Sequence, residues 1–286
     1  MSGMTQRRVQ ANGVDINLWL GGVGPPLLLL HGYPQTAQMW RKVAPRLAAD
    51  YLVVCPDLRG YGDSDKPADG YDKRAMARDM HELMLALGHP RYAVAGHDRG
   101  ARVAHRQALD FPDAVTHLCV LDIVPTHTLL SRTDRHVAAA YWHWFFFQSR
   151  ELPELMLGAV PEQFLRALFQ GMSHRKDAIE EPMLQEYLRA FTAPGTIRAG
   201  LEDYRAAATR DFADDERDLA LRVRCPVLVL WGEFGKMHAL FDVLDTWRDK
   251  AHQVQGHSLP CGHFIPEEAP EELLGRLREF LPTRPR

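Results

Sequence analysis

The sequence predicts an α/β fold in which a mostly parallel, doubly wound sheet carries an inserted helical lid. Short, continuous apolar runs alternate with amphipathic helical stretches, a pattern typical of strands buried on both faces of a parallel sheet. The alternation stops between residues 125 and 222, a stretch with helical patterns that is too long for a loop in a compact domain. We therefore expect a core domain made of residues 1–124 and 223–286, with a helical lid at residues 125–222.

The expected elements of the core follow this pattern in order. Apolar and polar residues alternate over 14–20, directly after Asn12-Gly13, which predicts a hairpin at the edge of the sheet. Apolar residues recur near helical spacing in three stretches of the core. These helices are expected at 74–87, 102–109 and 270–280, and the buried strands at 27–30, 52–55, 92–95, 118–121 and 227–231.

The composition excludes several classes of function. The net charge is −3 and no basic block is present, so neither nucleic acid nor an anionic membrane is an expected partner. We expect the partner to be a small molecule. The four cysteines lie far apart without a Cys-x-x-Cys pair, which argues against a zinc site or a disulfide framework and for reduced thiols. The sequence shows neither an export signal nor a membrane span, and we expect a cytoplasmic protein.

The segment 92–102 joins a predicted strand to a predicted helix and holds the strongest motif. Gly96 and Gly100 flank Asp98 at two residues on either side, the sharp turn on which hydrolases present a nucleophile, most often a serine. A carboxylate that attacks an acyl carbon gives only a mixed anhydride, whereas attack on a saturated carbon gives an ester that water can open. Asp98 therefore predicts attack on a carbon–halogen or an epoxide carbon.

Opening such an ester needs a base and a carboxylate that orients it. His263 lies in a loop after the last predicted strand, where this type of fold places its histidine. Asp122, at the end of the strand 118–121, is the preferred partner of the histidine, and Glu233 is the alternative. Asp122 is also compatible with a purely structural role as a helix N-cap before Pro125.

Two groups of residues are expected around this nucleophile. The backbone N–H groups of Tyr33, after the first parallel strand, and of Arg99 can form an anion hole. The side chains of Arg99 and Arg102 share a face of the helix start, where the helix dipole disfavours cations, so the pair suggests a bound carboxylate. The structural alternative is pairing of the arginines with Asp57, Asp63 or Asp122.

The predicted lid contributes a dense aromatic run, residues 141–147, and Tyr204 further along the chain. Such a run is most often the core of a lid. A departing halide, however, needs N–H or O–H donors in a dry pocket, which Trp, His and Tyr side chains supply.

Taken together, these motifs resemble those of the fluoroacetate dehalogenases of the α/β-hydrolase superfamily, over nearly the whole chain. The resemblance implies that Asp98 displaces the halide, that His263, held by Asp122, activates water, and that Arg99 and Arg102 grip the substrate carboxylate. It also implies that three lid residues stabilise the halide, namely His143, Trp144 and Tyr204. The matching segments are 31–35, 96–102, 121–125, 143–144, 202–205 and 262–268.

We therefore expect hydrolytic dehalogenation of short 2-haloacids, with no metal and no organic cofactor. The resemblance also implies a homodimer. The competing enzyme is an epoxide hydrolase with the same Asp98 nucleophile, in which Tyr141 and Tyr204 protonate the opening oxygen. A catalytically silent binding protein is the third hypothesis, and its hallmark would be a broken triad, whereas all three members are present here.

Overall fold

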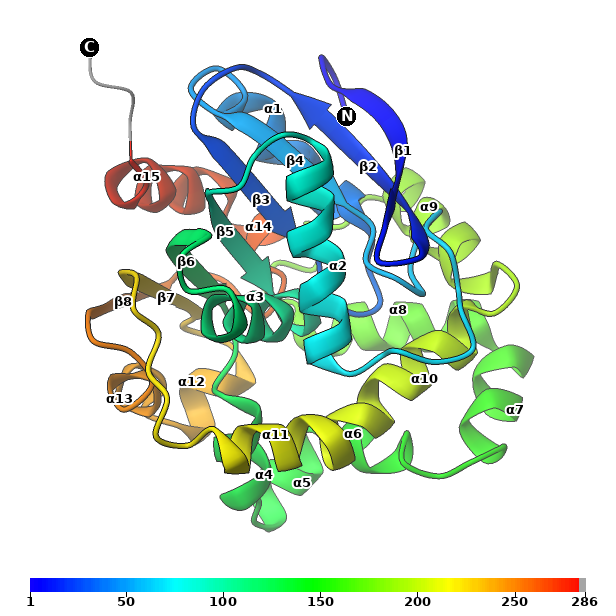
Figure 1. The fold of residues 1–286 in the computed structure, drawn as a ribbon. Coiled ribbons are helices and arrows are strands. Elements are labelled where there is room, and N and C mark those ends of the chain that lie inside the picture. The colour runs from blue at the N-terminus through cyan, green and yellow to red at the C-terminus, as the bar shows by residue number, and fades with distance from the viewer. Residues whose placement is uncertain (283–286) are drawn as a thin grey trace.

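The computed structural model describes residues 1–282, and its core is one eight-stranded sheet (Figure 1). The strand order is β1-β2-β4-β3-β5-β6-β7-β8, with antiparallel pairing of β1 with β2 and of β2 with β4 and parallel pairing elsewhere. This topology confirms the predicted fold class. The strands are β1 (Thr5–Ala11), β2 (Val14–Gly21), β3 (Pro26–Leu30), β4 (Leu52–Pro56), β5 (Tyr92–His97), β6 (Val115–Leu121), β7 (Val227–Gly232) and β8 (Val254–Leu259).

Helices cover both faces of the sheet because successive residues of each strand point to opposite sides. In β3, Leu28 and Leu30 pack in one core cluster with residues of α2 and α3, while Leu27 and Leu29 pack in a second cluster with residues of α1 and α15. All four leucines are fully buried. The core helices and 3₁₀ turn are η1 (Ala37–Lys42), α1 (Ala44–Leu47), α2 (Lys73–Ala86), α3 (Arg99–Asp110), α12 (Lys236–Leu240), α13 (Val243–Arg248), α14 (Ile265–Glu268) and α15 (Pro270–Phe280).

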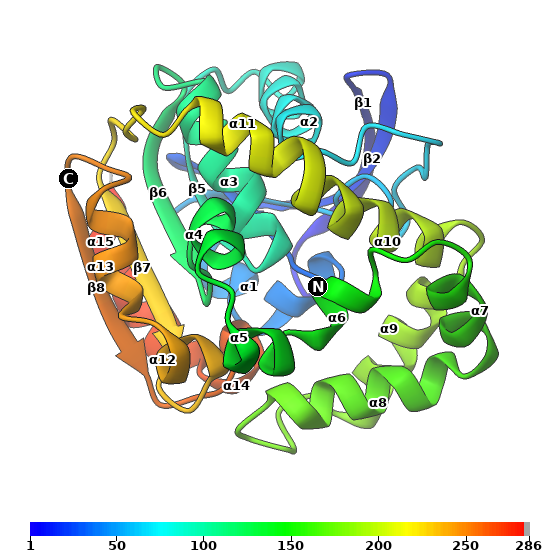
Figure 2. The ribbon, with the colours of Figure 1, turned by 90° about the horizontal axis from the view of Figure 1, so that it is seen from below.

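The segment between β6 and β7 is helical and lies beyond the ends of the strands toward which the arrows of β3 and β5 point (Figure 1). Figure 2, seen from below, shows these lid helices spread across that end of the sheet. They are α4 (Thr126–Ser131), α5 (Arg135–Ala140), α6 (Trp142–Phe146), α7 (Leu152–Ala159), α8 (Pro161–Met172), α9 (Glu181–Thr192), α10 (Thr196–Ala206), the π-helical turn η2 (Ala207–Asp211) and α11 (Phe212–Arg217).

One strand differs from the sequence-based expectation. The eighth strand, β8, was not predicted, since Gln255, His257 and Ser258 interrupt its apolar pattern. It pairs with β7 alone and forms an edge of the sheet, so one side of the strand faces solvent and tolerates polar residues. Within residues 1–282, no helix is both long and apolar enough to span a membrane.

Candidate active site

The centre of the site is the tight turn at Asp98, between β5 and α3. Asp98 adopts φ 47° and ψ −115°, a backbone conformation that residues other than glycine rarely take. The turn also brings backbone segments so close that a Cβ on Gly96 would lie 2.5 Å from the carbonyl oxygen of Gly100, and one on Gly100 would lie 2.2 Å from that of His31. Both glycines are therefore required by the close approach of the backbone segments.

The carboxylate of Asp98 is buried and ionised. Burial raises the pKa of this carboxyl, but the positive potential of His263, His97, Arg99 and Arg102 outweighs burial, and the pKa lies below its ordinary value. The backbone N–H of Tyr33 donates a hydrogen bond to Oδ2 of Asp98 at 3.0 Å. The predicted anion-hole donor of Tyr33 thus points at the predicted nucleophile.

His263 contacts Asp122 and not Glu233. Its Nδ1 lies 2.6 Å from Oδ2 of Asp122, whose Oδ1 accepts a hydrogen bond from the backbone N–H of Gly232 at 3.0 Å. Glu233 is exposed, and no hydrogen bond or ion pair involves its side chain within residues 1–282. The alternative N-cap role of Asp122 is wrong, because Pro125 occupies the cap position of α4.

The pair of His263 and Asp122 has the electrostatics of a base and its orienting acid. Burial lowers the pKa of His263, but the hydrogen bond and the charge of Asp122 outweigh this effect, so the pKa lies above the ordinary value for histidine. Asp122, like Asp98, has a positive φ (52°), and it directly follows β6 as Asp98 directly follows β5. Because β5 and β6 are parallel neighbours, the two acids come to the same edge of the sheet.

Most of the predicted site residues line one small cavity, whereas Arg99 and Asp122 lie outside its lining. Its volume is about 10 Å³ for the centre of a water-sized sphere, roughly the space that one water molecule needs. The lining residues come from both the core and the lid: Tyr33, Asp98, Arg102, Tyr141, His143, Trp144, Leu168, Met172, Tyr204, Met237 and His263.

Arg102 is a buried cation with no acidic partner among residues 1–282. One of its Nη atoms donates to the carbonyl oxygen of Val124 at 3.1 Å and to the hydroxyl of Thr126 at 2.9 Å, while Nε and the other Nη have no hydrogen-bond partner in this described part of the chain. Its guanidinium carbon lies 4.6 Å from the ring centre of Trp144. Burial and the charge of Arg99 lower the pKa of Arg102 to about 10, which still leaves the side chain charged at neutral pH.

Arg99, in contrast, is paired with Asp203 of the lid. Its Nε donates to Oδ1 of Asp203 at 3.0 Å, and one Nη donates to the backbone carbonyl oxygen of Asp203 at 2.9 Å. The second Nη is buried and has no hydrogen-bond partner in the part of the chain that the structure describes. Lys73 and Tyr61 also bond to the carboxylate of Asp203, so this acid is held from three sides.

The arginine partners considered from the sequence are therefore wrong, since none of those three acids pairs with either arginine. Asp57 accepts the backbone N–H of Ala37 at 2.8 Å, Asp63 pairs with Arg189, and Asp122 holds His263. Asp203 was missed because it lies 104 positions from Arg99, and no spacing rule connects them.

The predicted halide donors lie together on the lid side of the cavity. The ring centres of Trp144 and Tyr204 are 5.3 Å apart, and those of His143 and Tyr204 are 5.7 Å apart, both in edge-to-face contact. Burial lowers the pKa of His143 to about 3, so this imidazole is neutral. Burial raises the pKa of the Tyr204 phenol well above its ordinary value, which keeps its proton as a donor.

Tyr141 also lines the cavity. Burial raises the pKa of its phenol well above the ordinary value, so Tyr141 and Tyr204 both present protonated hydroxyls at the site. The two tyrosines that an epoxide hydrolase would need are thus both available by position.

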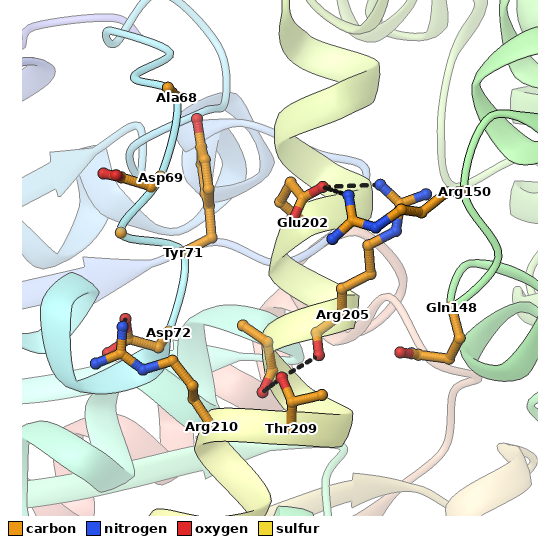
Figure 3. Close-up of a pocket in the computed structure, with 12 residues that line it drawn as sticks. Ala68, Asp69, Tyr71, Asp72, Gln148, Arg150, Glu202, Arg205, Thr209 and Arg210 are labelled. Carbon is orange, nitrogen blue, oxygen red and sulfur yellow. Dashed lines mark hydrogen bonds and ion pairs between the residues drawn. The ribbon is translucent and has the colours of Figure 1, made fainter.

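A second pocket, of about 320 Å³, is lined by residues of α10 and η2 and by residues 68–72 (Figure 3). Its charged groups pair with each other: Glu202 with Arg150 at 3.2 Å and with Arg205 at 2.9 Å, and Asp72 with Arg210 at 3.3 Å. Such internally paired charges leave little to attract a ligand. Among residues 1–282, no group of three or more His, Cys, Asp or Glu side chains is placed to hold a metal ion.

Comparisons with known proteins identify the family of this chain. Residues 25–270 match the family described as alpha/beta hydrolase fold. The chain is 46% identical to a fluoroacetate dehalogenase from Burkholderia sp, over 98% of this chain and 94% of the relative. It is 34% identical to a soluble epoxide hydrolase from Corynebacterium sp. (strain C12), over 98% and 99%. The crystal structure of ALR0039 from Nostoc sp PCC 7120 superimposes with a TM-score of 0.96 at 50% identity, covering 98% of each chain. The chain therefore belongs to the alpha/beta hydrolase family and is a hydrolase of this type.

Proposed function

We propose that this hydrolase removes halide from short 2-haloacids, converting a haloacetate such as fluoroacetate into glycolate and halide. The observation that carries the proposal is Arg102, a buried guanidinium that lines the same cavity as Asp98 and has no acidic partner within residues 1–282. A buried charge is stable only when it is paired, so this cation favours a ligand that brings a carboxylate. The 46% identical relative named fluoroacetate dehalogenase supports the same substrate class.

In the first proposed step, a carboxylate oxygen of Asp98 attacks the carbon that bears the halogen. The new C–O bond forms as the carbon–halogen bond breaks, and the halide leaves with the bonding electron pair. Donors from His143, Trp144 and Tyr204 stabilise the charge that develops on the halide. All three are uncharged hydrogen-bond donors that line the cavity.

In the second step, water opens the alkyl ester on Asp98. Nε2 of His263 accepts a proton from water, and the resulting hydroxide attacks the carboxyl carbon of Asp98. The backbone N–H groups of Tyr33 and Arg99 stabilise the oxyanion of the tetrahedral intermediate, and the Tyr33 N–H already bonds to the carboxylate at 3.0 Å. Collapse of the intermediate releases glycolate, whose alkoxide oxygen takes the proton from His263, and leaves Asp98 as a carboxylic acid. Because the pKa of Asp98 lies below its ordinary value, this acid then loses its proton to solvent and the carboxylate is restored.

The arginines hold the substrate carboxylate in line for this attack. Arg102 offers Nε and one Nη, and Arg99 offers one Nη. All three atoms are buried and have no hydrogen-bond partner among the described residues 1–282. A carboxylate that accepts these charge-assisted hydrogen bonds is fixed in orientation as well as bound, which lowers the entropy that the displacement must lose.

The alternative proposal is an epoxide hydrolase with the same Asp98 nucleophile. The cavity position of Tyr141 and Tyr204 favours it, and the 34% identical relative is named as a soluble epoxide hydrolase. A neutral epoxide, however, gives the unpaired Arg102 no counter-charge. Dehalogenation is therefore the reaction that accounts for more of the site.

The two proposals are separated by incubating the purified protein with fluoroacetate, chloroacetate and bromoacetate, and in parallel with styrene oxide. We expect halide release, measured with ion-selective electrodes, and no diol by chromatography. The Asp98→Asn variant is the blank for both assays. Diol formation without halide release would replace our proposal with the alternative. This experiment does not address the expected homodimer or the expected cytoplasmic location, which stay predictions.

A further inference from the structure

Glu268 follows the catalytic loop and turns its side chain back onto that loop. Its Oε2 accepts the backbone N–H of Gly262 at 3.0 Å, and its Oε1 accepts the backbone N–H of Phe264 at 3.0 Å. These are the residues immediately before and after His263. One carboxylate therefore fixes the peptide groups on both sides of the proposed base.

The same carboxylate also binds the lid. Oε2 of Glu268 accepts the backbone N–H groups of His174 at 2.7 Å and Arg175 at 2.8 Å, directly after helix α8. The side chain of Arg175 donates to the backbone carbonyl oxygen of Glu268 at 2.6 Å. The backbone N–H of His263 completes the junction by donating to the carbonyl oxygen of Met172 at 3.0 Å.

The junction is too tight to be an incidental contact. A Cβ on Gly262 would lie 2.5 Å from the backbone nitrogen of His174 and 2.6 Å from the carbonyl oxygen of Met172. The lid backbone thus rests directly on the catalytic loop. Met172 also lines the cavity, so the junction places the base and one wall of the pocket together.

The neighbouring Glu267 shows what a structural carboxylate looks like in this protein. Both glutamates are buried, with exposed fractions of 2% for Glu267 and 1% for Glu268. Glu267 pairs with Arg41 and Lys42 and accepts the hydroxyl of Tyr187 at 2.6 Å. No cation lies within ion-pair distance of the Glu268 carboxylate among residues 1–282, and its hydrogen bonds come from backbone N–H groups alone.

We propose that Glu268 is a positioning residue that sets His263 for ester hydrolysis by fixing the catalytic loop against the lid segment 172–175. The inference rests on the proposed function, in which His263 acts only in the second step. Loss of the clamp should therefore slow hydrolysis of the Asp98 ester and leave its formation largely intact. A purely structural glutamate would instead change both steps, or neither.

The first test is Glu268→Gln, because the amide keeps the size of the side chain. In the natural protein each carboxylate oxygen of Glu268 accepts at least one backbone N–H. Whichever way the amide of the variant turns, its NH₂ group therefore replaces an acceptor and faces at least one of these N–H groups. With excess chloroacetate we expect a burst of about one chloride per protein, followed by turnover roughly 10- to 100-fold slower than in the natural protein. Intact-protein mass spectrometry should show the accumulated ester.

Glu267→Gln is the matched control, since it is an adjacent buried carboxylate with the same chemical change. It is expected to lower the melting temperature without producing a chloride burst. If Glu268→Gln folds poorly, Gly262→Ala tests the same junction from the other side, because the added methyl pushes the lid segment away. It should also accumulate ester.

The outcomes separate the two proposals. Suppose that the natural protein releases halide but neither Glu268→Gln nor Gly262→Ala shows a chloride burst. If turnover is then unchanged, or is reduced together with ester formation, the positioning role of Glu268 is overturned. Failure of the natural protein to release halide from any haloacetate would contradict the proposed function itself and the inference built on it.

Discussion

Nδ1 of His263 lies 2.6 Å from Oδ2 of Asp122, and the backbone N–H of Gly232 holds the other carboxylate oxygen at 3.0 Å. With both oxygens engaged, Asp122 accepts a hydrogen bond from the Nδ1–H group of His263 in a fixed direction. This favours the tautomer that leaves Nε2 of His263 unprotonated and able to receive a proton from water.

The first prediction concerns pH. The proposed base works only when neutral. Burial lowers the pKa of His263, whereas the hydrogen bond and charge of Asp122, followed by the charge of Asp98, raise it above its ordinary value. The Asp98 ester is uncharged, so in the intermediate the contribution of Asp98 is lost and that of Asp122 remains. The rate of ester hydrolysis should therefore rise with pH as His263 loses its proton. In Asp122→Asn, the midpoint of this rise should move down and the plateau should fall. Single-turnover rates across pH 5–9 measure both, and a midpoint that stays in place would contradict the assignment.

The second prediction is that His263→Asn stops the reaction after its first step. Alkylation of Asp98 does not need the base, whereas hydrolysis of the ester does. Incubation with bromoacetate should leave a stable carboxymethyl adduct, and peptide mapping should locate it on Asp98. A protein that stays unmodified would argue against the covalent pathway.

The third prediction concerns the unpaired cation. Arg102→Leu removes a charge-assisted contact to the substrate carboxylate. We expect kcat/KM for haloacetate to fall at least roughly 30-fold, which corresponds to a loss of about 2 kcal/mol or more in transition-state binding. Arg217→Leu is the control, since Arg217 is an exposed lid arginine whose side chain pairs with Asp214. Equal kinetics for the two variants would assign Arg102 a structural role.

The fourth prediction concerns stability. Asp211 is buried beside Lys73, and one of its carboxylate oxygens has no hydrogen-bond partner within residues 1–282. Burial raises the pKa of Asp211 from 3.8 to about 6. The folded protein thus keeps this proton more tightly than the unfolded chain, so the contribution of Asp211 to stability falls as pH rises from about 4 to 6.

Asp211→Asn removes that penalty while keeping an acceptor for the backbone N–H of Lys73, which donates to Oδ1 at 2.7 Å. The variant should be more stable than the natural protein at pH 8, by up to roughly 3 kcal/mol, and similar to it at pH 4. Urea unfolding at both pH values measures the difference. A gain of equal size at the two pH values would contradict the ionisation argument.

Features encoded by local sequence were predictable. The turn at Asp98 needs two glycines and an adjacent strand and helix, all within residues 92–102, and the structure places them together. The preference for Asp122 over Glu233 as the neighbour of His263 also agrees with the observed contact, because the end of a central strand is a defined position in a parallel sheet.

Features that depend on distant packing were not predictable. Nothing near Arg99 in the sequence indicates that Asp203 from the lid neutralises it, and the four N–H bonds of Glu268 join residues from two separate parts of the chain. Strand β8 was missed for a different reason, since its position at the edge removes the apolar run on which strand prediction relies.

The small size of the cavity means that a substrate cannot enter the protein as it stands. The free space of about 10 Å³ is roughly that of one water molecule, and a haloacid is several times larger. Binding therefore requires lining side chains to move apart. The lining includes His143, Trp144 and Tyr204 of the helical segment between β6 and β7, so the proposed halide donors must shift outward from Asp98 as the haloacid enters.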